Sequence, residues 1–423
     1  MVAVLATQVQ AVVVAWQVYD LTGQPLALAY VGLAQFLPML CLLLPAGDLI
    51  DRYDRRRILS YSWTVSALCS ALLWWLADHG VQGVLGIYLV LVLYGSARAF
   101  GGPAMQSLLP QIVPRSQLAQ AIAANSMLMR GAAVGGPLLG GLLYALGGAR
   151  LTYGLCCAFL VLAVLLLRRV TVAHAGPRAP AQGTMVQRFA VGISFIRTRP
   201  IVLGTISLDL FAVLLGGVVA LLPIYAKEVL HVGPAGLGAL RSAMAVGEVG
   251  VGLFLSLRPI TRHVGRTMFL AVAVFGVANL VFSLSHMFWL SFAALVVAGG
   301  ADMVSVYIRG ALVQFSTPDA MRGRVSAVNM LFIGSSNELG EFRAGTSAAW
   351  MGAVPAALLG GVCTLGVVAA WMWAFPTLRR VDRFEEATET RAHGSAARPT
   401  DADANANAKA ATKADAARPQ SGA

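Results

Sequence analysis

Charged side chains are scarce in this sequence of 423 residues. Only 12% of the residues are Asp, Glu, Lys or Arg, whereas 58% are hydrophobic. Soluble domains average about 25% charged residues. A composition so poor in charge excludes an ordinary water-soluble globule and indicates a protein that lies largely within a membrane.

The sequence also lacks the motifs of several enzyme classes. It has no Gly-x-x-x-x-Gly-Lys-Ser/Thr stretch for ATP phosphates, no His-Glu-x-x-His stretch for zinc and no Gly-x-Ser-x-Gly turn for a nucleophilic serine. None of its five cysteines has metal-ligand spacing with a histidine, and all five lie in apolar runs. We therefore expect no cofactor, no resident metal and no ATP hydrolysis. The cysteines are Cys41, Cys69, Cys156, Cys157 and Cys363.

The sequence consists mostly of long apolar runs. Twelve of them have roughly the 20 residues that a helix needs to cross a hydrocarbon core of about 30 Å. They do not alternate polar and apolar residues as barrel strands do, so the sequence predicts an all-α membrane protein of twelve spans. The runs lie at residues 1–19, 27–47, 58–77, 83–104, 118–146, 151–168, 201–226, 235–257, 266–285, 287–311, 323–348 and 352–375.

One long polar connection, residues 169–200, divides the runs into two groups of six. We expect a six-helix half at 1–168, a second at 201–384, and a short interfacial helix near 184–197 within the connection. The tail at 385–423 is rich in Ala, Asp, Asn and Lys without aromatic residues, and is expected to be disordered.

The first run begins at Met1 with no basic residue before it. A cleavable signal peptide would carry a charged region there. We expect a first membrane helix that is truncated at its start.

The net charge of +12 is distributed unevenly along the chain. Lys and Arg fall mainly in alternate loops and in the tail, and the intervening loops hold little beyond Arg150 and Lys227. Because basic residues in short loops stay on the cytoplasmic side, both termini are predicted to be cytoplasmic. The basic charge thus reports membrane topology, and we expect no nucleic-acid partner.

The densest charge lies at residues 47–57, Gly-Asp-Leu-Ile-Asp-Arg-Tyr-Asp-Arg-Arg-Arg, between two apolar runs, which predicts a tight cytoplasmic loop. Gly47 allows backbones to approach closely, and Asp51 can accept hydrogen bonds from free N–H groups where a helix begins. Arg52, Arg55 and Arg56 can bind carboxylates or the carbonyl ends of helices. The alternative is a plain loop that only sets topology.

The fifth run contains a second distinctive segment, Gly-Gly-Pro-Leu-Leu-Gly-Gly at 135–141. Gly136, Gly140 and Gly141 allow membrane helices to pack closely, and Pro137 removes one backbone hydrogen bond and bends the helix. Ordinary small-residue packing is the alternative interpretation.

The two halves of the chain resemble each other weakly. A shift of 204 positions aligns Pro114 with Pro318 and Asn125 with Asn329, and it also aligns Arg98 with Asp302. Repeats of this kind are typical of transporters that bind substrate between their halves, near the middle of the membrane.

Charged residues within the apolar runs are costly and usually functional. Only carboxylates can cycle protons, because Arg stays protonated, and removal from water favours the neutral form of a carboxylate. The alternative is structural pairing, for example of Arg241 with Glu248. The candidates for a substrate or proton pathway are Arg98, Arg130, Asp209, Glu248, Asp302, Glu338 and Glu341.

The loop at 47–57 and the segment at 135–141 resemble two motifs of the major facilitator superfamily of secondary transporters. The loop resembles the one between helices 2 and 3 of that superfamily, although Asp54 replaces the usual glycine. The segment resembles the antiporter motif of exporters, although Ala132 replaces a glycine that is typical upstream of it. Further stretches resemble the branch of bacterial efflux proteins that includes the enterobactin exporters. They lie at 16–23, 32–38, 209–214, 322–325 and 337–342, with Arg343 where another acidic residue is expected.

The resemblance covers residues 1 to about 384 and implies two halves that rock to expose a site alternately to each side. It implies that the charged loop latches the halves on the cytoplasmic face, that protons drive transport, and that the direction is export. We therefore expect a monomeric inner-membrane transporter that exchanges protons for a siderophore or amphipathic small molecule. The alternatives are an importer or facilitator of a small metabolite, a transporter-like receptor and an intramembrane enzyme.

Overall fold

A computed structural model describes residues 1–79, 83–170 and 185–386, and these ranges form helices without a β-strand. Short 3₁₀ turns occur at Arg115–Gln117 and Val219–Leu221, and a π-helical turn, η3, at Tyr225–Val229. The α-helices are α1 (Val2–Thr22), α2 (Pro25–Arg52), α3 (Arg55–Asp78), α4 (Val84–Ile112), α5 (Leu118–Arg169), α6 (Met185–Arg197), α7 (Pro200–Gly216), α8 (Leu222–Ile224), α9 (Gly233–Leu257), α10 (Val264–Leu284), α11 (Phe288–Ser316), α12 (Asp319–Met351), α13 (Ala353–Ala374) and α14 (Pro376–Arg380).

By length and composition, ten helical segments of the described residues can cross a membrane. One of them, α5, is interrupted at Gly147 and Gly148, which leave helical geometry; Gly148 has φ 65°, a conformation that favours glycine. The helix α12 is not among the ten, although its 33 residues are long enough, because charged side chains lower its hydropathy. This arrangement is compatible with the twelve predicted spans.

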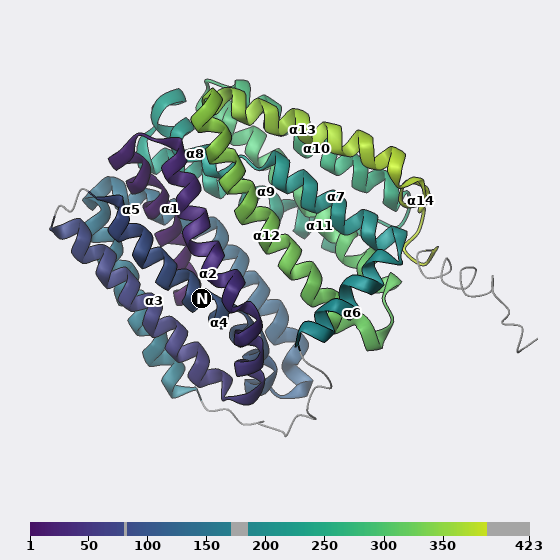
Figure 1. Cartoon of the computed structure of the whole chain (residues 1–423), viewed down its shortest axis with the longest axis horizontal. Coiled ribbons are helices and arrows are strands. Elements are labelled where there is room, and N and C mark those ends of the chain that lie inside the picture. The colour runs from purple at the N-terminus through teal and green to yellow at the C-terminus, as the bar shows by residue number, and fades with distance from the viewer. Residues whose placement is uncertain (80–82, 171–184, 387–423) are drawn as a thin grey trace, which may run out of the picture.

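The helices form two groups. In Figure 1 the purple and blue helices α1–α5 lie at the lower left, and the teal to yellow-green helices α7–α13 extend across the top to the right. Between the groups, α5 packs on α9 and α2 packs on α12. We call the first group the N-terminal half and the second the C-terminal half. The short α6 lies within the connection predicted at residues 169–200.

The charged segment is largely helical. The helix α2 continues to Arg52 and α3 begins at Arg55, so only Tyr53 and Asp54 separate them. The Asp54 carboxylate caps α3 by accepting a hydrogen bond from the backbone N–H of Arg56 at 2.9 Å. The predicted loop is therefore correct in place but shorter than expected. We call this end of the bundle the loop end; α1 and α3 end at the opposite end.

Candidate functional site

A cavity of about 710 Å³ lies between the two halves. Its wall on α2 runs from Leu28, near the opposite end, to Leu43, and its wall on α12 runs from Ala327 to Glu341. Phe189 of α6 also lines it. Because Leu43, Ala327 and Phe189 lie toward the loop end, the cavity extends from the region of Leu28 to that end.

An apolar cluster closes the opposite end. It is built from both halves, since α1 and α2 contribute side chains that pack against the segment following α7 and against α9 and α10. We call this cluster the plug. Its members include Val12, Trp16, Tyr19, Leu28, Leu221, Leu222, Tyr225, Leu240 and Phe282.

An ion pair crosses the cavity from one half to the other. The Nη1 atom of Arg98, on α4, lies 3.5 Å from Oε1 of Glu338, on α12, and donates a hydrogen bond to Oε1 of Gln35 at 3.3 Å. The Arg98 side chain is 41% exposed and that of Glu338 is 17% exposed. A pair with this much exposure contributes little to stability, typically about 0–1 kcal/mol. It can therefore open and close at low cost.

A second cavity of about 400 Å³ adjoins the first, with Arg241 and Glu341 in the walls of both. It lies mainly in the C-terminal half and is lined by Glu248 of α9 and Asp302 of α11. The structure thus brings three predicted carboxylates, Glu248, Asp302 and Glu341, to one compartment. Arg241 donates to the Ala11 carbonyl on α1 at 3.4 Å, so it contacts the N-terminal half.

Arg130 lies beside this compartment. Its Nη1 atom, on α5, is 3.8 Å from the sulfur of Met303, the residue after Asp302 on α11. Arg130 therefore brings a positive charge from the N-terminal half toward the acidic compartment.

The helix α7 breaks between the two cavities, and its freed carbonyls bind side chains. Arg343 donates from Nε to the Leu214 carbonyl at 3.1 Å and from Nη2 to that of Gly217 at 3.2 Å. Asn279 donates to the Gly216 carbonyl at 3.2 Å. Backbone groups in a membrane need such partners. No role was predicted for Arg343 from the sequence; the glycine pair at 216–217 within an apolar run was the available signal.

Asp209 lies apart from both cavities. It forms an ion pair with Arg309, which joins α7 to α11. The two side chains are only 8% and 5% exposed, respectively. An ion pair this deeply buried favours a structural role. The structure does not bring Asp209 together with the other predicted carboxylates.

The glycine-rich segment of α5 contacts both halves. A Cβ atom on Gly140 would lie 2.9 Å from the Val9 carbonyl of α1, and one on Gly136 would collide with Gln8. On the other side, a Cβ on Gly141 would collide with the Pro234 carbonyl of α9, and the Pro137 carbonyl lies against Gly238. The motif thus sets a close crossing of α5 and α9 between the halves.

Gly141→Ala is expected to lower both the melting temperature and the transport rate. The added methyl group has no space at the α5–α9 crossing, and overpacking of this kind typically costs about 1–3 kcal/mol. Gly135→Ala is the matched control, because a Cβ there meets no atom within 4 Å. Thermal unfolding in detergent and transport in vesicles measure the two effects; equal behaviour of the two variants would contradict the crossing.

The charged loop contacts its own half. Arg56 donates from Nε to the Leu167 carbonyl at 3.1 Å and from Nη2 to the Arg168 carbonyl, at the C-terminal end of α5. A cation is favourable at that end of a helix. Arg52 pairs with Asp48 at 3.0 Å, one turn earlier on α2. Arg55 is buried and Gly47 is half-buried. The Asp51 side chain lies outside the described part, and the latch between the halves stays a prediction.

Comparisons with known proteins agree with this architecture. Residues 1–404 match the model of a family described as transmembrane secretion effector. The enterobactin exporter EntS of Citrobacter koseri is 28% identical over 353 residues, 81% of each chain, and that of Escherichia coli O1:K1 is 28% identical over 293 residues, 68% of each chain.

Solved structures resemble the fold. A bacterial homologue of the human lysosomal transporter Spinster, inward-facing and occupied, superimposes with a TM-score of 0.65 at 17% identity, over 88% of this chain and 96% of that one. A bacterial homologue of the iron transporter ferroportin, inward-facing, gives 0.65 at 16% identity with the same shares. The superpositions establish a common fold, whereas identities this low carry no information about the substrate.

Proposed function

Because this chain belongs to the transmembrane secretion effector family of the major facilitator superfamily, and is a multi-pass membrane transport protein, we propose that it exports an amphipathic small molecule in exchange for protons. A siderophore is the first candidate, since curated relatives at 28% identity are enterobactin exporters. The observation that carries the proposal is the Arg98–Glu338 pair, which joins the halves inside the large cavity.

The cavity suits an amphipathic substrate. Small-molecule sites commonly measure about 300–1,000 Å³ and combine apolar walls with a few polar groups. Here Trp63, Tyr94 and Phe189 supply aromatic surface, and Gln35 and Arg98 supply hydrogen-bonding groups. The volume of about 710 Å³ fits a molecule of drug or siderophore size.

Exchange requires that proton and substrate exclude each other. We place that competition at Glu338: a hydroxyl or amine of the substrate donates a hydrogen bond to the carboxylate, and a proton bound to the same carboxylate removes its charge and weakens that bond. Substrate arriving from the loop end displaces the proton, and a proton arriving from the opposite end displaces the substrate. One proton thus enters for each substrate released, which couples export to the proton gradient.

We propose that the protein lies in the inner membrane. For export, its loop end must face the cytoplasm. Reporter fusions after residues 175 and 385 should both indicate cytoplasm, and a fusion after His286, between α10 and α11, should indicate the periplasm as a control. A periplasmic reporter at either of the first two positions would overturn this orientation.

The function is tested in vesicles and in cells. Inside-out vesicles should accumulate a fluorescent siderophore or dye when a proton gradient is imposed, and a protonophore should abolish the accumulation. A deletion strain should secrete less siderophore or become sensitive to a drug in a panel. Proton-driven uptake into right-side-out vesicles, without efflux, would refute export and favour an importer.

A further inference from the structure

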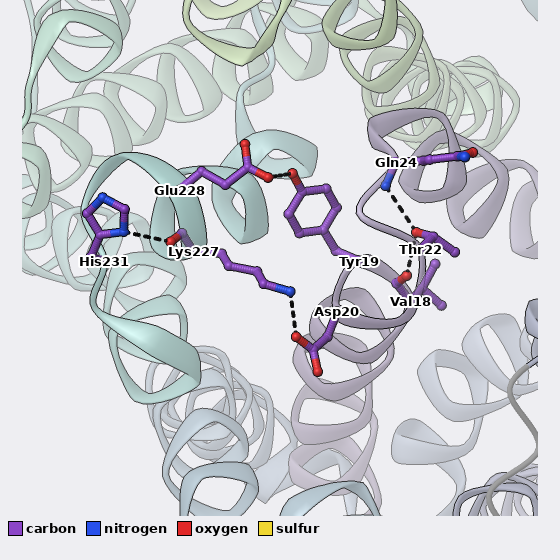
Figure 2. Close-up of polar contacts among 8 residues, drawn as sticks. All are labelled: Val18, Tyr19, Asp20, Thr22, Gln24, Lys227, Glu228 and His231. Carbon is purple, nitrogen blue, oxygen red and sulfur yellow. Dashed lines mark hydrogen bonds and ion pairs between the residues drawn. The ribbon is translucent and has the colours of Figure 1, made fainter.

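A compact set of polar contacts joins the two halves at the end opposite the loop end. Figure 2 shows Tyr19 and Asp20, at the end of α1, facing the π-helical turn η3 that carries Lys227 and Glu228. Lys227 Nζ lies 2.6 Å from Asp20 Oδ1, and the Tyr19 hydroxyl donates to Glu228 Oε1. The Lys227 ammonium also lies 5.8 Å from the centre of the Tyr19 ring.

The turn that presents these side chains has an uncommon backbone. The Leu230 N–H donates to the Tyr225 carbonyl at 2.8 Å, five residues earlier, which is the π-helical pattern. His231, with φ 52°, ends the turn, and its Nδ1 lies 3.1 Å from the Lys227 carbonyl. π-Helical turns are rare and are frequent at functional sites, and a non-glycine residue with positive φ is likewise unusual. An uncommon turn thus presents the side chains that contact the other half.

The contacts lie on the rim of the plug. Tyr19 is 1% exposed and belongs to that apolar cluster together with Trp16 and Tyr225. Lys227 and Asp20 are 36% and 47% exposed, so water can replace their contact when the halves separate. The buried Tyr19 ring fixes the geometry of the contact between the halves. The solvated Lys227–Asp20 pair contributes little free energy, so the contact is easily broken.

We propose that Tyr19, Asp20, Lys227 and Glu228 form an exit latch, which holds the end opposite the loop end closed while the cavity faces the loop end. The inference rests on the proposed function only in assuming that the two ends open alternately. Since the two bonds join adjacent residues of α1 to adjacent residues of η3, parting of the halves breaks both together. The latch therefore biases the resting protein toward the state that accepts substrate from the loop end.

The test measures the opening of this end directly. Spin labels at Gln24 and Met287, in a background without the five cysteines, report the distance between an N-terminal and a C-terminal loop at the closed end. Tyr19→Phe, which keeps the ring, and Asp20→Asn with Lys227→Gln should each raise the population at long distance about two- to fivefold. The exchange Asp20→Lys with Lys227→Asp should restore the short distance.

A second ion pair at the same end provides the control. Arg150 Nε lies 2.9 Å from Asp78 Oδ1, but α5 and α3 both belong to the N-terminal half. Arg150→Gln with Asp78→Asn should therefore leave the distance distribution unchanged. Unaltered distances in the latch variants, or an equal shift in the control, would overturn the latch. The measurement needs neither substrate nor proton gradient, so its failure is separate from a failure of the efflux assay.

Discussion

Replacing Arg309 by methionine is expected to reduce sharply the amount of folded protein in the membrane. The substitution leaves the Asp209 carboxylate without its ion-pair partner, in a region where both side chains are less than 10% exposed. Residues near the pair on α7 and α11 belong to one apolar cluster, among them Leu208, Ala212, Ile308 and Leu312. Removing one partner of a buried pair typically costs about 3–5 kcal/mol. That is a large share of a typical folding free energy of about 5–15 kcal/mol.

The double variant Asp209→Leu with Arg309→Met separates stability from mechanism. Apolar replacement of a whole buried pair is often neutral or stabilising, so the double variant should regain most of the lost melting temperature in detergent. An unchanged melting temperature of Arg309→Met alone would show that the pair contributes nothing. If the stable double variant still exports substrate, Asp209 lies outside the proton pathway. If the variant is folded but inactive, Asp209 is again a candidate for the proton pathway.

The order of helices could be predicted from the sequence, because a helix in lipid satisfies its own backbone and requires only about 20 apolar residues. The run at 323–348 contains Glu338 and Glu341, yet α12 extends over Asp319–Met351. The short helix predicted near 184–197 is present as α6, Met185–Arg197. Information local to each segment was sufficient for these elements.

Partners of the charged residues could not be predicted, because they depend on which helices meet across the cavity. The repeat relation aligned Arg98 with Asp302, whereas the structure pairs Arg98 with Glu338 and places Asp302 in the adjoining cavity. Similarly, the role of Arg343 depends on the break in α7. A single sequence gives the chemistry of a side chain but not the distant backbone group that it binds.

Glu338→Gln is expected to abolish accumulation of substrate against its gradient while leaving downhill movement measurable. Glutamine keeps the size of the side chain but can neither take up nor release a proton. It also weakens a charge-assisted hydrogen bond to the substrate, worth about 1.5–3 kcal/mol, so affinity should fall about 10- to 100-fold. The Arg98→Gln variant, which leaves the carboxylate unpaired, should also lose coupled transport.

Proton release on substrate binding locates the coupling site. Purified protein in weakly buffered detergent solution should release protons when substrate is added, and Glu338→Gln should release none at a substrate concentration raised to restore binding. Asp302→Asn is the matched control, because it removes a carboxylate from the adjoining cavity and leaves the Arg98–Glu338 pair intact. Normal release by Glu338→Gln together with loss in Asp302→Asn would move the exchange to the compartment of Glu248 and Asp302. Substrate and proton would then bind in separate cavities, and the shared wall at Arg241 and Glu341 would have to transmit the coupling between them.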